Sequence, residues 1–257
     1  MIPLGELRAR YDAEMRRDPV PDPHTRVDRD GPVVRVLGDE NYVIYSDLEG
    51  ADAARVVAEQ VAYFRRVGQE VEWKTFGHDR PADLEAILAR AGFVPDEPET
   101  LVVFDLREGL PGGPVPADVT VRRVTDRAGL RDAATANDAA FGAEGTEFLE
   151  RWSDRLDDPN VGLFVAYVEG SPAATGRVQL TPGRSFAGLW GGGTAPPHRH
   201  RGVYRSLVRV RASFARDYGH RFLTVDARET SRPILERLGF VRLTTTRAWV
   251  LRPGKTA

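Results

Sequence analysis

The stretch TAPPHRHRGVYRSL, residues 194–207, decides the predicted fold because it joins a glycine-rich strand to a helix. Residues 185–194 are predicted to form the strand, and residues 203–217 the helix. Unpaired backbone N–H groups at a helix start and the helix dipole together attract anions. Gly202 has no Cβ, so a ligand can approach the backbone closely there. The turn is therefore predicted to bind a compact polyanion such as a pyrophosphate.

Charge is unevenly distributed along the chain. The 257 residues include 36 Lys and Arg against 38 Asp and Glu, which gives a net charge of −2. No carboxylate occurs between Glu169 and Asp217, and this window contains eight arginines: Arg177, Arg184, Arg199, Arg201, Arg205, Arg209, Arg211 and Arg216. The window supports an anion site at the turn, and the alternative interpretation is a solvated basic helix face.

Composition excludes several classes of protein. The chain has no cysteine, which excludes disulfides, zinc–thiolate sites, iron–sulfur clusters and a thiol nucleophile, and no metal site is predicted. No apolar run approaches the ~18 residues of a membrane span, and the first residues lack a signal-peptide pattern. We therefore expect a cytoplasmic protein without a membrane partner. The nearly neutral charge gives no case for binding nucleic acid.

Two domains are predicted. Residues 108–118 read EGLPGGPVPAD, with three Pro and three Gly and no hydrophobic periodicity, which is typical of a boundary. After this boundary, the predicted element order β-α-α-β-β-β-α-β-α-β indicates a mixed α/β layer architecture. The predicted domains are residues 1–110 and residues 119–257.

The first half of the chain resembles part of the second. The predicted helix 51–67 parallels helix 203–217, and LEAILARAGFV at 84–94 parallels RPILERLGFV at 232–241. The segment that corresponds to the anion-binding turn, residues 47–52, reads DLEGAD, and its acidic side chains would repel a pyrophosphate. We therefore interpret the first half as a degenerate, partial copy with an N-terminal helix, packed on the working domain.

The turn and its surroundings resemble the GNAT superfamily of acyl-CoA-dependent N-acyltransferases. The family loop Arg/Gln-x-x-Gly-x-Gly/Ala corresponds to RHRGVY at residues 199–204, with Tyr204 in place of the last glycine. Residues 231–240, SRPILERLGF, are similar to the family's fourth-helix ending. The resemblance spans about residues 119–251 and implies a GNAT-like mixed, mostly antiparallel sheet flanked by helices.

This resemblance implies that acetyl-CoA binds as a co-substrate in a cleft between the fourth and fifth strands of the second domain. Backbone amides of residues 199–204 would hold its pyrophosphate, and its pantetheine would pair with the end of the strand. The implied cofactor-binding residues are Gly193, Thr194, Ala195, Arg199, His200, Arg201, Gly202, Val203, Tyr204 and Arg205. A strand N–H would polarise the thioester carbonyl, and a neutral amine would attack directly.

The sequence departs from the family at the expected catalytic residues. Residues 189–193, LWGGG, contain no glutamate base, and Leu235 stands where many members have a tyrosine that protonates the thiolate. Asp226 is a candidate base near the end of a strand, and the alternative is a strand-end or capping carboxylate. Tyr204 is a candidate donor to CoA, and the alternative is that it packs under the loop.

The acceptor site is predicted where the family's variable first helices cover the amine. Candidate acceptor residues are Phe141, Glu144, Glu147, Phe148, Trp152 and Trp190. A carboxylate among aromatic rings suits a cationic amine, and the alternative is that Phe148 and Trp152 only face the core. In the first half, EWK at 72–74 and GHD at 77–79 also allow an acid–base interpretation, although Asp79 is equally an ordinary helix cap.

These observations predict an enzyme that moves an acetyl group from acetyl-CoA to the primary amine of a small molecule or peptide. Two alternatives are a non-catalytic acyl-CoA-binding or regulatory protein and a GNAT-fold enzyme that uses another acyl-CoA. Without a cysteine, acyl transfer is expected to be direct, with no acyl-cysteine intermediate. The acceptor amine, the role of the first half and the oligomeric state do not follow from the sequence.

Overall fold

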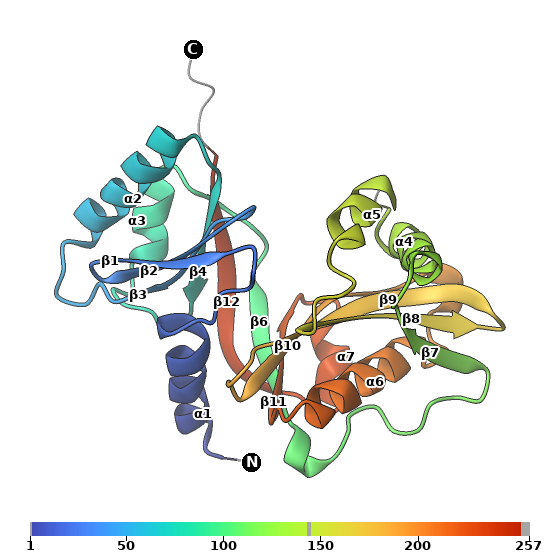
Figure 1. Ribbon diagram of the computed structural model, residues 1–257. Coiled ribbons are helices and arrows are strands. Elements are labelled where there is room, and N and C mark those ends of the chain that lie inside the picture. Colours follow the sequence, from blue (N-terminus) through green and yellow to red (C-terminus); the bar gives the residue numbers. More distant parts are fainter. Residues whose placement is uncertain (1, 143–144, 253–257) are drawn as a thin grey trace. The chain divides into compact units, whose positions relative to one another are not determined.

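The computed structural model describes residues 2–142 and 145–252, which form two compact units (Figure 1). Unit 1 contains residues 103–225 and 234–241. The described residues of unit 2 are 2–102, 226–233 and 242–252. Within the described residues, no helix is long and apolar enough to cross a membrane.

Unit 2 contains an antiparallel sheet with one parallel pair and two helices that pack on it. Its strands are paired in the order β1-β2-β3-β4-β12, β3 and β4 are parallel, and the short strand β5 also pairs with β12. The elements are α1 (Leu4–Tyr11), a π-helical segment (Asp12–Arg17), β1 (Arg26–Asp30), β2 (Val33–Leu37), β3 (Tyr42–Ser46), α2 (Ala53–Val67), β4 (Val71–Phe76), α3 (Leu84–Arg90), β5 (Val94–Pro95) and β12 (Val241–Leu251).

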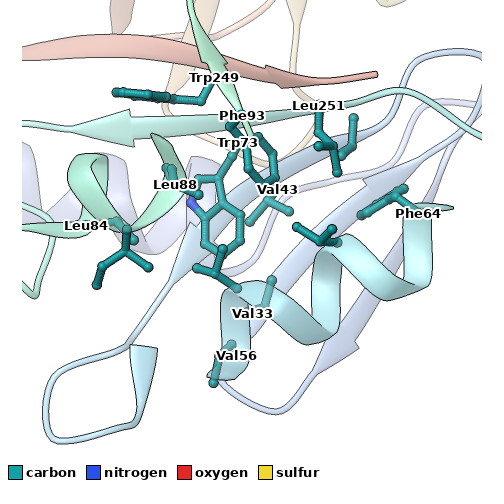
Figure 2. Packing of buried hydrophobic residues seen from close by; sticks show 14 of the residues in the cluster. Val33, Val43, Val56, Phe64, Trp73, Leu84, Leu88, Phe93, Trp249 and Leu251 are labelled. Carbon is teal, nitrogen blue, oxygen red and sulfur yellow. The ribbon is translucent and has the colours of Figure 1, made fainter. Parts of the chain in front are cut away.

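One face of α2 carries much of the core of unit 2. Val57, Val61 and Phe64 recur at helical spacing, and all three are buried. They belong to the same cluster as Trp73 of β4, which lies at the centre of the side chains drawn in Figure 2. At the helix start, the carboxylate of Asp52 accepts an N–H of the first turn, which is the capping that the sequence provides.

The last strand of the chain, β12, packs with the first half of the chain. It pairs antiparallel with β4, from Thr246 opposite Phe76 to Leu251 opposite Val71. Trp249 and Leu251 are buried in the core of unit 2 (Figure 2). The compact units therefore do not follow the predicted boundary, which assigns this strand to residues 119–257. Pairing between strands so far apart in the chain leaves no local signal in the sequence.

Unit 1 contains a second, mostly antiparallel set of strands in the order β6-β11-β10-β9-β8-β7, in which β10 and β11 are parallel. Along the chain, β6, β11, α7 and β12 each contain residues of both units. The elements are β6 (Glu99–Asp105), a 3₁₀ turn (Leu106–Glu108), β7 (Val119–Arg123), α4 (Arg127–Phe141), α5 (Gly145–Ser153), β8 (Val161–Val168), β9 (Ser171–Leu180), β10 (Phe186–Thr194), a 3₁₀ turn (Pro196–His198), α6 (Val203–Asp217), β11 (Phe222–Ala227) and α7 (Arg232–Arg237).

Helices α4 and α6 cover opposite faces of the unit 1 strands (Figure 1). A Cβ placed on Gly193 would meet the Phe141 ring of α4 at 2.4 Å. A Cβ on the preceding Gly192 would meet Tyr204 and Arg211 of α6, both at 3.2 Å. Because neighbouring residues of a strand face opposite sides, these contacts place one helix on each face. The predicted mixed, mostly antiparallel sheet flanked by helices is confirmed.

Candidate functional site

Strand β10 contains a bulge, which we define as residues 190–193. Trp190 pairs with Arg177 of β9, but Gly193 pairs with Thr175, so two residues of β10 lie opposite one residue of β9. The extra residue of a bulge is left out of the ladder of backbone hydrogen bonds. Gly191, one of the two, has a φ of +55°, which L side chains rarely adopt. The bulge therefore leaves strand backbone available to a ligand.

The turn after β10 leads directly into an uncapped helix start. The α6 helix begins at Val203, with Gly202 as its N-cap at a φ of +79°. Within the described part of the chain, no side chain caps this helix start. His200, also in the turn, has a φ of +62°. The first N–H groups of α6 therefore have no intrahelical or capping acceptor, which is the arrangement that binds phosphate.

Arg201 does not point a free charge at this turn. Its Nη2 lies 2.7 Å from Asp118 Oδ2 and 3.6 Å from Glu169 Oε1. The hydrogen bond from Arg201 lowers the pKa of Asp118. The window between Glu169 and Asp217 lacks carboxylates only along the sequence, because in the folded chain Asp118 and Glu169 lie beside Arg201.

The other arginines of the window disperse as well. Arg199 Nε donates to the Thr194 carbonyl at 3.1 Å, and the Arg205 side chain lies against Gly202. Arg211 is buried beneath the β10 bulge with an exposed fraction of 1%. Arg199, Arg201 and Arg211 therefore direct their side chains at other protein groups, and the predicted anion site at the turn rests on the backbone features of the turn.

A cavity of about 380 Å³ lies in unit 1 beside the β10 bulge. It is lined by residues of α4, α5, β8, β9 and β10: Asn137, Glu147, Phe148, Arg151, Trp152, Leu163, Thr175, Gly176, Arg177, Trp190 and Gly191. Four residues that the sequence nominated for acceptor binding are thus brought together. Of the other two, Phe141 packs over Gly193, and Glu144 lies outside the described residues.

Aromatic side chains form one wall of this cavity. The Arg177 guanidinium carbon lies 5.1 Å from the centre of the Trp152 ring and 5.8 Å from that of Trp190. Phe148 and Trp152 have ring centres 6.4 Å apart. Trp152 also belongs to the hydrophobic core under α4. Core packing and cavity lining therefore coexist in this side chain, so the two interpretations of the aromatic pair do not exclude each other.

Tyr204 packs with its ring against the β10 bulge, on the α6 side of the sheet. Burial raises the pKa of its phenol, and the nearby Arg211 guanidinium opposes this only in part. The phenol therefore stays protonated at neutral pH, as a proton donor must. The structure thus places this residue beside the bulge.

Asp226 is a residue of unit 2, and both of its carboxylate oxygens are engaged there. Oδ2 lies 2.6 Å from Lys74 Nζ, and Oδ1 accepts a hydrogen bond from Thr246 Oγ1 at 2.9 Å. The side chain is only 6% exposed. To act as a base, Asp226 would have to give up one of these two interactions. Lys74 of the EWK motif is thus the ion-pair partner of Asp226.

Sequence reasoning missed a second carboxyl group near this pair. Burial, and next the Asp226 charge, raise the pKa of Glu99 to about 7. Glu99 is the first residue of β6, and it belongs to none of the motifs found in the sequence. Its unusual protonation depends on neighbours that folding brings from other parts of the chain.

The GHD motif belongs to a buried network with the N-terminal helical segment. Arg16 Nη2 donates to both oxygens of Asp79, at 2.7 and 2.9 Å. His78 Nε2 lies 2.8 Å from Asp12 Oδ2. Asp79 also accepts the backbone N–H of Phe76 at 2.9 Å, so its carboxylate serves the network and a tight turn. The N-cap position of α3 is occupied by Asp83 instead, whose side chain makes no capping hydrogen bond.

Comparisons with known proteins find solved structures of the same fold and a family match over part of the chain. Residues 131–240 match the model of the Acetyltransferase (GNAT) family. A GCN5-related N-acetyltransferase from Kribbella flavida is 18% identical, with 99% of this chain and 97% of that chain covered and a TM-score of 0.68. A GCN5-related N-acetyltransferase from Sphaerobacter thermophilus is 16% identical, with coverages of 88% and 83% and a TM-score of 0.61.

A tandem GNAT protein from the clavulanic acid biosynthesis pathway is also similar in structure. It is 16% identical, with 93% of this chain and 86% of that chain covered and a TM-score of 0.60. No curated protein sequence matches the chain. At these identities the structural likeness shows the fold, and the family comes from the match at residues 131–240. The resemblance stated from the turn and the fourth-helix ending is confirmed.

Proposed function

From the GNAT acetyltransferase domain at residues 131–240, we propose that the chain transfers an acetyl group from acetyl-CoA to a primary amine. One observation carries this proposal: within unit 1, the β10 bulge leads through a short turn to the uncapped start of α6. The bulge offers strand N–H groups, and the helix start offers N–H groups to phosphate. Both are needed to bind a thioester of a pyrophosphate-bearing cofactor.

The residues present fit acetyl-CoA. Gly193, Thr194 and Ala195 would pair with the pantetheine, because they lie at the end of β10, which still pairs with β9 there but pairs with β11 only up to Gly188. The backbone of residues 199–205 would hold the pyrophosphate at the α6 start. When bound, acetyl-CoA supplies the activated acetyl group, and the chain supplies its orientation.

The transfer is a direct displacement. The neutral amine nitrogen would attack the thioester carbonyl carbon, the carbon–sulfur bond would break with CoA leaving as a thiolate, and the extra proton on the amine nitrogen would pass to water. N–H groups of the β10 bulge would stabilise the negative charge on the carbonyl oxygen. Tyr204, with its protonated phenol beside the bulge, is our candidate donor to the thiolate.

The cavity beside the bulge would receive the acceptor. Glu147 is the one carboxylate among the lining residues that the structure describes, and we assign it the cationic end of the amine. Phe148, Trp152 and Trp190 would pack against the rest of the acceptor. A small molecule or the amine of a peptide would be the partner.

The test is a steady-state assay of free CoA thiol with acetyl-CoA and a panel of primary amines. We expect thiol release that depends on the amine and equals the N-acetylated product. Tight CoA binding without turnover across the panel would instead identify a non-catalytic binding protein. Turnover only with longer acyl-CoAs would identify another acyl donor.

A further inference from the structure

A buried cation lies directly beneath the β10 bulge. Arg211 of α6 is 1% exposed. Its Nε donates to the Leu207 carbonyl at 3.2 Å, and its Nη1 donates to the carbonyls of Arg177 at 3.0 Å and Trp190 at 3.4 Å. Among the described residues, all of its hydrogen-bond acceptors are backbone carbonyl oxygens and none is a carboxylate.

Such a cation is costly to bury. Taking a guanidinium out of water is unfavourable unless an opposite charge compensates it. Burial lowers the pKa of Arg211 to about 10, so it keeps its charge at neutral pH. Carbonyl dipoles offset only part of the lost hydration. A leucine or methionine would fill the same space without this cost, so the charge itself needs a reason.

The two acceptors on the sheet belong to the residue pair at which the bulge begins. Arg177 and Trp190 face each other across β9 and β10, and the register shift follows them. Their side chains also line the cavity. A single guanidinium therefore fixes the carbonyls at the edge of the bulge and, through the same backbone, two residues of the cavity wall.

Glycines on both strands make room for this arrangement. A Cβ on Gly176 would lie 2.8 Å from Arg211 Nη1, and a Cβ on Gly192 would lie 3.2 Å from Arg211 Nη2. The first distance is shorter than real contacts allow. The glycine-rich sequence of the two strands thus accommodates the guanidinium as well as the bulge.

We propose that Arg211 is a positioning residue for acetyl transfer, which holds the β10 bulge open and keeps a positive charge beneath it. This inference rests on the proposed function. With the Trp190 carbonyl of the bulge turned toward Arg211, N–H groups of the bulge would be left to face the thioester oxygen. The buried charge then favours the negative charge that develops on that oxygen in the transition state. It acts through the backbone and touches no substrate.

The experiment compares Arg211→Met, Arg211→Lys and the wild type in the thiol-release assay. Removing a direct oxyanion donor lowers kcat by 10²–10³, so we expect a smaller loss of about 10- to 100-fold for Arg211→Met. Arg211→Lys should recover part of kcat, because it keeps the charge. Arg216→Met is the matched control, since Arg216 lies on the exposed end of α6.

Two further readouts separate positioning from simple structural support. Replacing an uncompensated buried charge by an apolar side chain is often neutral or stabilising. Arg211→Met should therefore keep the melting temperature of the wild type, and its affinity for CoA should change by no more than about threefold. In a double-mutant cycle with Gly192→Ala, the added methyl group should lower kcat less when Arg211 is already methionine.

If Arg211→Met turns over as fast as the wild type, the inference is wrong. It is also wrong if kcat, CoA affinity and melting temperature all fall together in both Arg211 variants, since that describes a folding defect. If Arg211→Met does not fold, Arg211→Lys decides: a partial loss of kcat with weakened coupling to Gly192→Ala supports the inference, and a wild-type kcat with unchanged coupling overturns it. A wild type that acetylates no amine overturns the proposed function and this inference with it.

Discussion

The buried ion pair between Lys74 and Asp226 provides a stability prediction for unit 2. In Lys74→Met, Asp226 would stay buried at 6% exposure, with Thr246 as its remaining hydrogen-bond donor among the described residues. Glu99 and Glu72 are carboxyl groups whose pKa is raised, with Asp226 among the causes, so the surroundings already disfavour negative charge. Leaving one member of a buried pair uncompensated costs about 3–5 kcal/mol.

The assay is urea unfolding followed by tryptophan fluorescence and circular dichroism. We expect Lys74→Met to lower the free energy of unfolding by about 3–5 kcal/mol at pH 7. The control is Arg55→Met, which breaks an ion pair with Glu59 that is 2.5 Å long but 61% and 54% exposed. That change should stay within about 0.5 kcal/mol.

A second variant tests the electrostatic reason. Adding Asp226→Leu to Lys74→Met removes both charges, and replacing a buried pair by apolar residues is often neutral. The double variant should therefore be more stable than Lys74→Met alone. If Lys74→Met costs no more than Arg55→Met, or if the double variant is the least stable, the reasoning about this pair is refuted.

Three further outcomes are expected. Because the pKa of Glu99 is raised from 4.5 to about 7, Glu99 is protonated in the folded state over a pH range in which it is ionised in the unfolded state. The free energy of unfolding should therefore fall by about 1–3 kcal/mol as the pH rises from 4.5 to 7. Urea titrations of Glu99→Gln should lack this dependence on pH. Gly202→Asp puts a side chain and a negative charge at a φ of +79°, so calorimetry should show CoA binding weakened about tenfold or more. Glu147→Gln and Trp152→Ala should raise KM for the amine more than KM for acetyl-CoA in the thiol assay, and an unchanged amine KM in both would remove the cavity from the acceptor site.

Local patterns predicted the parts of the fold that depend on local chemistry. The helix predicted at 203–217 is observed at Val203–Asp217, and the strand predicted at 185–194 is observed at Phe186–Thr194. Glycine, proline and hydrophobic periodicity determine such elements over short distances. The family resemblance, rather than a local pattern, nominated Glu147 and Trp190 for the acceptor site, and the structure brings both to one cavity.

Features that depend on long-range pairing were not predictable. Strand β12 belongs to unit 2 because it pairs with β4. The charge of Arg201 is paired because Asp118 lies beside it in the folded chain. In the sequence Arg211 is one of eight arginines of the basic window, and its burial depends on glycines of β9 and β10. In each case the partner lies far away in the sequence, so no periodicity or motif records the contact.

The most direct test of the proposed acetyl transfer measures CoA thiol and N-acetylated product together, from wild-type protein with and without an added primary amine. We expect both to form in equal amounts and only when the amine is present, and we expect Gly202→Asp to require more acetyl-CoA for the same rate. Acetyl-CoA that binds at the α6 start and is never consumed, or thiol release that is the same without any amine, would contradict it.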